Sequence, residues 1–171
     1  MSVSELDAQI SVSLKIASGV PATRNIPGNL PRILKSIASN YDIDYMLYDL
    51  SPNVGGLNEV VLMSSDYFIV PASPDFFCLQ AVGSLEKHII KWHKEINYFR
   101  TQNDFTSKDF PIPNKPVFLG IIQQRYLPRN DRPTVSFDKW ITLIRLAVNE
   151  RLVPALRDID CVIDEDSIRS V

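Results

Sequence analysis

The sequence predicts an α/β fold with a mostly parallel sheet and flanking helices, and two observations lead to this prediction. Short apolar runs of strand length cover residues 43–49, 67–71 and 117–123. Longer segments with apolar residues at helical spacing separate these runs. Strands that alternate with helices are joined by right-handed crossovers, which makes the sheet parallel. A length of 171 residues suits one domain with a sizeable core, so we expect a single domain over residues 1–171.

Residues 1–40 are expected to form a helical N-terminal segment. The first helix covers residues 4–18, with Ser4 as a candidate N-cap. A loop with several Pro and Gly residues follows, and a second helix covers residues 30–40. Pro31 is tolerated there because it falls in the first helical turn, where its missing N–H is not needed.

The rest of the chain alternates between helices and strands. The elements follow in this order: a short helix over 55–64, the strand over 67–71, a long helix over 76–99, a loop insertion over 101–116, the strand over 117–123, and a helix over 135–157 that Pro154 kinks or ends. The loop insertion is rich in Asn, Asp, Ser, Lys and Pro, which are residues typical of loops.

Composition excludes several classes of protein. A net charge of -2 gives no overall attraction to nucleic acid or to anionic membranes, although a local basic face remains compatible with it. Two cysteines are too few for a disulfide framework and lack the spacing of metal ligands. No apolar run reaches the roughly 20 residues of a membrane span, and the N-terminus has no basic-then-apolar signal pattern. We therefore expect a soluble, cytoplasmic protein.

Asp49 is the residue that points most directly to chemistry. It ends the apolar run over 43–49, and Ser51 and Pro52 follow it. In a parallel sheet this places a carboxylate at the carboxyl end of a buried strand, where α/β proteins bind their ligands. Such an aspartate holds a water on Mg²⁺ beside nucleotide phosphates in many enzymes. A strand-end aspartate that caps the following turn fits the pattern equally well.

Four stretches of the chain together resemble the ParA/MinD-type partition ATPases, a family of P-loop NTPases. Residues 45–52 (Tyr-Met-Leu-Tyr-Asp-Leu-Ser-Pro) resemble the Walker B segment of that family. The other three stretches occur in the family's order: residues 56–59 with Ser65 and Asp66, residues 68–75, and residues 120–126. The resemblance covers about residues 41–150, and it implies a P-loop NTPase-like fold that binds ATP and Mg²⁺ and works as a dimer.

The resemblance also implies roles for individual residues. Asp49 would be the catalytic Walker B carboxylate and would hold Mg²⁺ through a water. Pro52 would lie close to the switch region, and Pro71 and Gln124 would border the nucleotide base. Each role has a plain alternative, because Pro52 also suits turn geometry, Pro71 suffices to stop a strand, and Gln124 is also a polar strand end.

The chain departs from this family at the phosphate loop. The family's loop has the form Lys-Gly-Gly-x-Gly-Lys-Thr, whereas none of the six glycines here begins a Gly-Lys-Ser/Thr signature. The sequence is thus similar to the carboxyl-terminal portion of such an ATPase, or to a relative without the catalytic front, and we expect it to bind little ATP alone. The family's phosphate-loop strand lies beside the Walker B strand, so its absence leaves strand edges unpaired. We therefore expect self-association or a ParA-like or other partner protein.

A basic cluster near the third strand is the candidate for contacts with DNA. Its members are Arg125, Arg129, Arg132, Lys139 and Arg145. ParA-like proteins bind DNA non-specifically through basic residues on carboxyl-terminal helices, which makes this cluster the best match. Asp131 and Asp138 dilute it, and an ordinary solvated surface explains the same pattern.

Two functions therefore follow from the sequence. The first is an ATPase-like protein related to plasmid or chromosome partitioning, which by itself neither binds nor hydrolyses ATP because the phosphate loop is absent. The alternative is a non-catalytic interaction module that binds a full-length ATPase or a regulatory partner. The family is enzymatic, whereas we expect this chain alone to be inactive.

Overall fold

The computed structural model describes residues 2–15, 24–51, 54–103, 105, 110–124, 128–129, 132–133 and 135–163. The chain divides into two compact units, and each is described here by itself. Unit 1 consists of Met1–Ser65 with Lys91–Lys115, and unit 2 consists of Asp66–Ile90 with Pro116–Val171. The long helix α4 (Phe76–Gln102) contributes its first part to unit 2 and its second part to unit 1. The prediction of a single domain over residues 1–171 stays a prediction.

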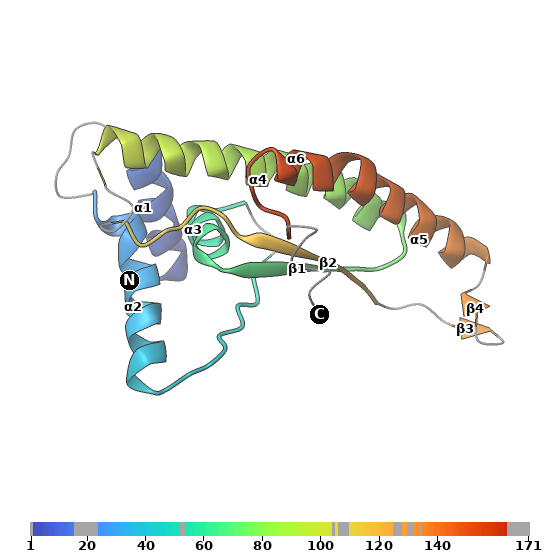
Figure 1. The fold of residues 1–171 in the computed structure, drawn as a ribbon, viewed down its shortest axis with the longest axis horizontal. Coiled ribbons are helices and arrows are strands. Elements are labelled where there is room, and N and C mark those ends of the chain that lie inside the picture. Colours follow the sequence, from blue (N-terminus) through green and yellow to red (C-terminus); the bar gives the residue numbers. More distant parts are fainter. Residues whose placement is uncertain are drawn as a thin grey trace. The chain divides into compact units, whose positions relative to one another are not determined.

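Unit 1 is helical in its described residues. It contains α1 (Val3–Lys15), α2 (Ile26–Asn40) and α3 (Gly56–Ser64), and each of these three helices contacts the other two (Figure 1). Its core combines aliphatic side chains with an aromatic group, in which the ring centroids of Phe99 and Phe110 are 5.8 Å apart. The largest fully buried aliphatic side chains of this unit are Ile10, Met63, Ile96 and Ile112.

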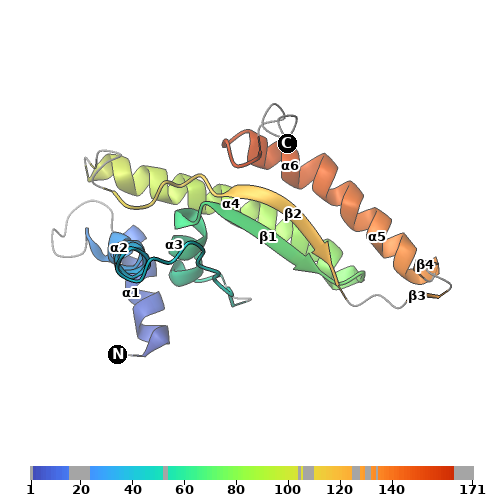
Figure 2. The same ribbon diagram turned by 60° about the horizontal axis from the view of Figure 1, so that its bottom comes forward.

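Unit 2 contains a small parallel sheet with helices over one face. Strands β1 (Tyr67–Ala72) and β2 (Val117–Gln123) pair in parallel, from Tyr67 opposite Val117 to Ala72 opposite Gln123 (Figure 2). On the covered face, the rings of Phe68 and Phe118 lie 5.1 Å apart. An isolated parallel bridge joins Phe118 to Val162 on the far side of β2. This is the expected α/β class, with the first part of α4 as the crossover between the strands.

The last helical stretch of unit 2 is interrupted by a π-helical turn. Helix α5 (Val135–Ala147) passes into the turn η1 (Val148–Leu152) and then into α6 (Val153–Arg157). Pro154 lies in the first turn of α6, where a missing N–H is tolerated. The prediction that Pro154 kinks or ends the helix is thus replaced by a π-helical turn just before the proline. A short antiparallel pair, β3 (Pro128–Arg129) and β4 (Arg132–Pro133), precedes α5.

Most other predicted elements agree with the structure. The helix predicted over 4–18 corresponds to α1, with its last three positions outside the described residues. Helix α2 begins four residues earlier than predicted, so the prediction that Pro31 falls in the first helical turn is wrong, and Pro31 lies inside the helix. The short helix over 55–64 and the strands over 67–71 and 117–123 are confirmed as α3, β1 and β2. Within the predicted loop over 101–116, Thr101 and Gln102 still belong to α4.

The prediction of a buried strand over residues 43–49 is wrong. In Figure 1 this segment is a coil that runs from α2 toward α3, and none of its residues belongs to a strand. Tyr45 is 89% exposed and Leu47 is 97% exposed. A strand forms only where a neighbouring strand accepts its backbone hydrogen bonds, and within the described residues of unit 1 no strand is present to do so. The segment therefore has side chains typical of a strand, but no strand in the described part of unit 1 pairs with it.

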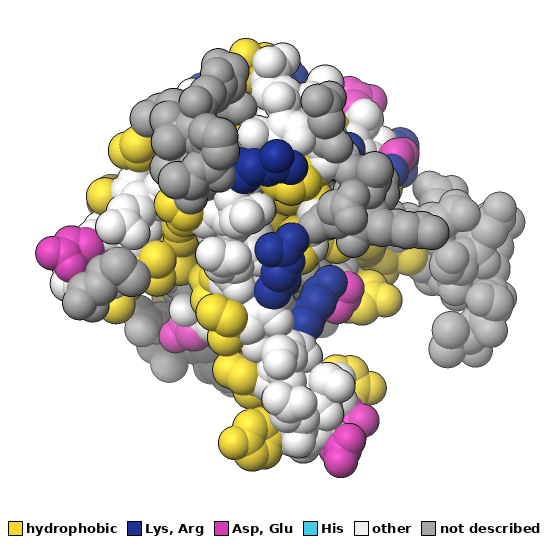
Figure 3. Space-filling view, turned by 90° about the vertical axis from the view of Figure 1, so that its left-hand side faces the viewer, with side chains coloured by type: hydrophobic (Ala, Val, Ile, Leu, Met, Phe, Trp, Pro, Cys, Tyr) yellow, Lys and Arg dark blue, Asp and Glu magenta, His cyan; other side chains and the backbone are white. Residues whose placement is uncertain are grey.

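The side of the molecule that carries α1 and α2 shows how charge is distributed near this segment. Figure 3 shows hydrophobic and acidic side chains together at the lower end of this side, whereas the Lys and Arg side chains of this view lie higher up.

In the described part of the chain, no helix is long and apolar enough to cross a membrane.

Candidate functional site

Asp49 lies at the end of the exposed coil of unit 1, and the turn after it is tied to α3. The Asp49 side chain is exposed. Two residues further on, the Ser51 carbonyl accepts a hydrogen bond of 2.6 Å from the buried Asn58 amide nitrogen. The Ser51 hydroxyl is also 3.5 Å from the Asn58 side-chain oxygen. Asn58 thus fixes the path of the chain from Asp49 into α3, while the carboxylate itself faces solvent.

The first turn of α3 is capped by two side chains of α1. The Gly56 N–H donates to the Ser11 hydroxyl oxygen at 2.9 Å, and the Leu57 N–H donates to an Asp7 carboxylate oxygen at 2.8 Å. These amides have no partner within their own helix, and a carboxylate there also complements the helix dipole. Gly55 and Gly56 permit the close approach, because a Cβ on Gly56 would lie 2.6 Å from the Ser11 backbone nitrogen.

Glu59 is a buried carboxyl group of unit 1 with a strongly raised pKa. It is 6% exposed, and its Oε1 atom has no hydrogen-bond partner in the described part of the chain. Burial away from water, with a smaller contribution from the negative charge of Glu95, raises the pKa of Glu59 to about 8. Lys91 and Lys15 act in the opposite direction. Lys91 also pairs with Glu95 at 3.7 Å, so its charge is shared between the two carboxylates.

Two of the predicted nucleotide-binding residues lie at one edge of the sheet in unit 2. Pro71 and Gln124 are both exposed at the carboxyl ends of β1 and β2. The Gln124 N–H donates to the Ala72 carbonyl at 2.9 Å, which extends the parallel ladder by one bond. At the same edge, Asp75 caps α4 by accepting from the Cys78 N–H at 2.8 Å. Pro71 does not stop its strand, because β1 continues to Ala72.

The predicted site residues are divided between the two units. Asp49 belongs to unit 1, whereas Pro71 and Gln124 belong to unit 2. Pro52 lies outside the described residues. Pro71 and Gln124, the two residues expected at the base, thus lie at the same sheet edge of unit 2. Asp49, the carboxylate expected at the metal, belongs to unit 1.

The candidate DNA-binding residues are described in part. Arg125 lies outside the described residues, and for Arg129 and Arg132 only the backbone is described, in the β3–β4 pair. Lys139 and Arg145 are exposed on α5, and the Lys139 ammonium lies 5.8 Å from the centroid of the Trp140 ring. Both positions are accessible to a phosphate.

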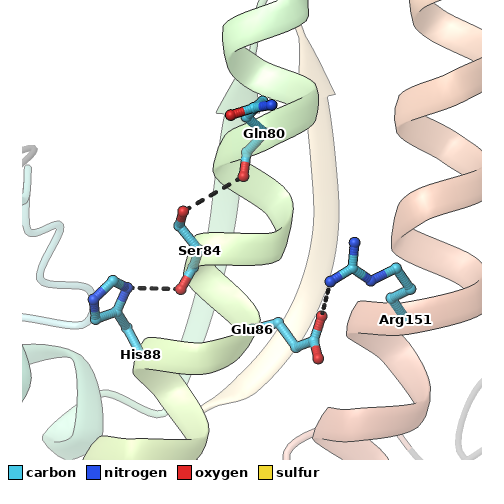
Figure 4. Close-up of polar contacts among 5 residues, drawn as sticks. All are labelled: Gln80, Ser84, Glu86, His88 and Arg151. Carbon is cyan, nitrogen blue, oxygen red and sulfur yellow. Dashed lines mark hydrogen bonds and ion pairs between the residues drawn. The ribbon is translucent and has the colours of Figure 1, made fainter.

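Other titratable side chains of unit 2 form hydrogen bonds or ion pairs within and between its helices. Figure 4 shows His88, whose Nδ1 lies 2.6 Å from the Ser84 carbonyl of the preceding turn. In the same view, Arg151 of the π-helical turn reaches Glu86 of α4 at 3.2 Å. Among the residues that the structure describes, no group of three or more His, Cys, Asp or Glu side chains is placed to hold a metal ion.

The Gly56 and Leu57 amides are not free to bind a nucleotide phosphate. The amides at the start of α3, which follows Asp49 in the chain, already bind the Asp7 carboxylate and the Ser11 hydroxyl. The sequence from residue 36 to residue 86 contains no Lys, Arg or His to neutralise phosphate charge. We therefore assign no catalytic step to ATP in this chain.

Sequence reasoning missed three of these site residues. Asp7 and Ser11 are separated from their partners in α3 by 50 and 45 positions, and no local pattern signals such a contact. Glu59 did carry a signal, because it is the one charged residue in a mostly apolar helix over Gly56–Ser64. A lone carboxylate beside Val60, Val61 and Leu62 indicates burial on at least one side.

Comparison with known proteins gives one family. A family model described as an AAA domain matches residues 8–101, which is more than half of the 171 residues. No curated protein and no solved structure matches the chain. The matched range includes Asp49, the capped start of α3 and strand β1, and it ends within α4. The chain therefore belongs to the AAA-domain family, a family of P-loop NTPases.

Proposed function

We propose that this chain is a relative of the ParA/MinD-type partition ATPases that by itself neither binds nor hydrolyses ATP. The order of the four sequence stretches supports the finer family assignment, and the first three stretches lie within the matched range 8–101. One observation carries the second half of the proposal. The helix start that follows Asp49 is occupied by Asp7 and Ser11, in a chain without a Gly-Lys-Ser/Thr signature.

In this proposal Asp49 is a Walker B carboxylate whose ancestral task is to hold a water on Mg²⁺. Gln124 and Pro71 mark the edge where the family binds the base, and a primary amide such as that of Gln124 both donates and accepts hydrogen bonds. In the intact family, ATP joins two subunits, and hydrolysis releases DNA or a partner protein during the movement of plasmid or chromosomal cargo. This chain retains the carboxylate and the base edge of such a protein.

Nucleotide affinity tests the proposal. A fluorescent ATP analogue is titrated with the protein in Mg²⁺ and, separately, in EDTA. We expect no saturable binding up to about 1 mM, the upper end of ordinary substrate affinities. Micromolar, Mg²⁺-dependent binding that Asp49→Asn abolishes would refute the proposed loss of ATP binding. The matched control is Asp158→Asn, which changes an exposed aspartate of unit 2, whereas Asp49 belongs to unit 1.

A second candidate function is a non-catalytic interaction module. The observation that favours it is the exposed apolar coil over residues 43–50, since large apolar side chains in water commonly mark a binding surface. Such a module would bind its partner equally well with and without nucleotide, which separates it from an ATP-dependent switch in one binding measurement.

A third candidate is a DNA-binding adaptor, which the exposed Lys139 and Arg145 favour. Retention on non-specific duplex DNA is measured over a range of salt concentrations, because phosphate contacts weaken steeply as salt rises. Retention that is lost in the double variant Arg129→Ala with Arg132→Ala would support this function. No retention at low salt would exclude it.

A further inference from the structure

We propose that an aromatic surface of unit 2 stacks the unpaired bases of a single-stranded nucleic acid. The surface consists of Phe76 and Phe77 in the first turn of α4 and of Lys139 and Trp140 in α5. All four residues belong to unit 2, so the contacts among them lie within one compact unit. The inference goes beyond the proposed functions, because it concerns unpaired bases rather than ATP or the phosphates of duplex DNA.

The surface begins at the end of the sheet where parallel α/β proteins bind their ligands. Strand β1 ends at Ala72 and α4 begins at Phe76, so residues 73–75 alone connect the carboxyl end of the strand to the first ring. Figure 2 shows the start of α4 at the end of the sheet where β1 and β2 stop. Open α/β sheets bind ligands outside the carboxyl ends of their strands. The position of Phe76 and Phe77 therefore suits a binding role.

The three rings of this surface meet edge to face. The Phe76 ring centroid is 5.9 Å from that of Phe77 and 6.1 Å from that of Trp140, at interplanar angles of 70° and 71°. Such contacts hold the rings in place without stacking one on another. Phe77 is 80% exposed and Phe76 is 49% exposed, so much of both rings is in contact with solvent. A planar base stacks on a ring of this kind, because every base has a π-face.

The aromatic cluster of unit 1 has the opposite properties. The rings of Phe99, Phe105 and Phe110 include two stacked pairs, with interplanar angles of 26° and 21°. Phe99 is 1% exposed and Phe110 is 5% exposed, as expected of a close-packed core. Phe76 and Phe77 are neither buried nor stacked on each other. Exposed aromatic side chains that gather in this way mark a binding surface.

The charge beside the rings suits a polyanion. The Lys139 ammonium lies 5.8 Å from the centroid of the Trp140 ring, within the range of a cation–π attraction. Lys139 and Arg145 are both exposed on α5, about 9 Å apart along the helix axis. Residues 124–149 contain five basic and two acidic residues. Cations beside stacking rings are the arrangement with which proteins bind single strands without sequence preference.

Two other anionic occupants suit this surface less well. A duplex keeps its bases stacked on one another, so it would contact the cations and leave the Phe77 ring without a stacking partner. An anionic membrane binds a helix along one continuous apolar face, whereas these rings come from the first turns of two different helices. A single strand uses both the rings and the cations, and we therefore assign the surface to it.

Three labelled oligonucleotides of roughly 15 nucleotides test the proposal. One is an oligothymidine strand, the second is an abasic strand with the same number of phosphates, and the third is the oligothymidine strand paired with its complement. Fluorescence anisotropy follows their binding to the full chain at low salt. We expect the oligothymidine strand to bind at least about tenfold more tightly than the abasic strand and the duplex. Equal affinity for the first two would overturn the proposal, and so would equal or tighter binding of the duplex.

Variants of Phe77 assign the binding to the rings. We expect Phe77→Leu to weaken binding of the oligothymidine strand at least about fivefold and Phe77→Trp to preserve it, because Leu is apolar but has no ring. Neither variant should change the affinity for the abasic strand. Tyr98→Leu is the matched control, since Tyr98 is an aromatic residue of α4 that is 57% exposed in unit 1. Equal losses in Phe77→Leu and Tyr98→Leu would contradict the assignment.

Lys139→Ala separates charge from stacking. We expect it to weaken the oligothymidine and abasic strands alike, and to reduce the slope of log affinity against log salt by about 0.7, the value for one phosphate contact on a single strand. Phe77→Leu should leave that slope unchanged. Lys87→Ala, which removes an exposed lysine of α4 in unit 2, is the matched control. Equal affinity and slope in Lys139→Ala and Lys87→Ala would show that α5 does not contact the strand, which contradicts the proposal.

Phosphatidylserine vesicles test the membrane as the occupant. Vesicle binding that Phe77→Leu abolishes, together with no binding of the oligothymidine strand, would assign the surface to a membrane and overturn the proposal. Circular dichroism and the melting temperature confirm that each variant is folded. The titrations contain no ATP, so their failure leaves the ATP proposal intact, and micromolar ATP binding would leave this one intact.

Discussion

Glu59→Gln is the substitution whose effect the structure defines most sharply. Glu59 lies in α3 with 6% of its surface exposed, and burial is the main reason that its pKa rises from 4.5 to about 8. Glu95 adds to the rise, whereas Lys91 and Lys15 oppose it. In the folded protein Glu59 therefore keeps its proton at pH values where the unfolded chain has lost it. Gln is close in size and cannot ionise, so the substitution removes this proton linkage while preserving the volume of the side chain.

The sign and size of the effect follow from linkage. Between the unfolded pKa of 4.5 and the folded pKa of about 8, the folded state binds the extra proton, so the free energy of unfolding falls as pH rises. The contribution of Glu59 is fully present below pH 4.5 and is lost as pH rises through about 8. Each pKa unit corresponds to about 1.4 kcal/mol, so between about pH 5.5 and about pH 7.5 the loss amounts to roughly 2–3 kcal/mol.

Urea unfolding of unit 1 provides the assay. The chain has two tryptophans, and Trp92 is buried in unit 1 whereas Trp140 lies in unit 2. In a Trp140→Phe background, fluorescence therefore reports on the surroundings of Trp92. Over that pH interval, we expect the free energy of unfolding to fall by roughly 2–3 kcal/mol more in the protein that retains Glu59 than in the Glu59→Gln variant. Glu150→Gln, at an exposed position, is the matched control and should leave the pH dependence unchanged.

One outcome would refute this reasoning. If the curves of unfolding free energy against pH run parallel with and without Glu59→Gln, the carboxylate is not protonated in the folded state above its ordinary pKa. The side chain would then be ionised in unit 1, with Lys91 or Lys15 as its counter-charge. A parallel change in the Glu150→Gln control would instead assign the pH dependence to general surface charge.

Two further predictions concern the packing of the chain. Gly56→Ala should lower the melting temperature, with a cost of about 1–3 kcal/mol, because its Cβ would lie 2.6 Å from the Ser11 backbone nitrogen. Gly83→Ala should be neutral or stabilising, because its Cβ meets only the flexible end of Arg151 at 3.2 Å; equal losses in both variants would contradict the argument. Asn114 has a φ of 64° and is 1% exposed, so in urea unfolding Asn114→Ala should be less stable than Asn114→Gly by about 1 kcal/mol. Equal stability of these two variants would show that the backbone conformation there is not costly.

The parts of the fold that were predictable from sequence are those that depend on nearby residues. The helices α1, α3 and α4 follow from the spacing of apolar residues along one helical face. Strands β1 and β2 are short apolar runs, and each finds its neighbour in the other, as the fold class requires. The shift in register between Phe68 and Ile69 has no such local signal, because it depends on how two distant strands align.

The candidate site was less predictable, because its contacts join distant segments. The position of Gln124 beside the end of β1 follows from parallel pairing, so the sheet edge was foreseeable. The capping of α3 by Asp7 and Ser11 was not, since the three helices of unit 1 decide it by packing. The extent to which Glu59 is buried was likewise not predictable, because it depends on how α3 packs within unit 1.

The failed strand over residues 43–49 shows where prediction from local pattern fails. Its side chains satisfy every local criterion for a buried strand, and the structure nevertheless leaves Tyr45 and Leu47 in water. Local pattern reports what a segment prefers, whereas strand formation requires a second strand at hydrogen-bonding distance. The segment therefore carries the local signal of a strand, while no strand in the described part of unit 1 pairs with it. A local pattern of this kind predicts what a segment prefers, and the packing of segments distant in the sequence decides whether the segment forms a strand.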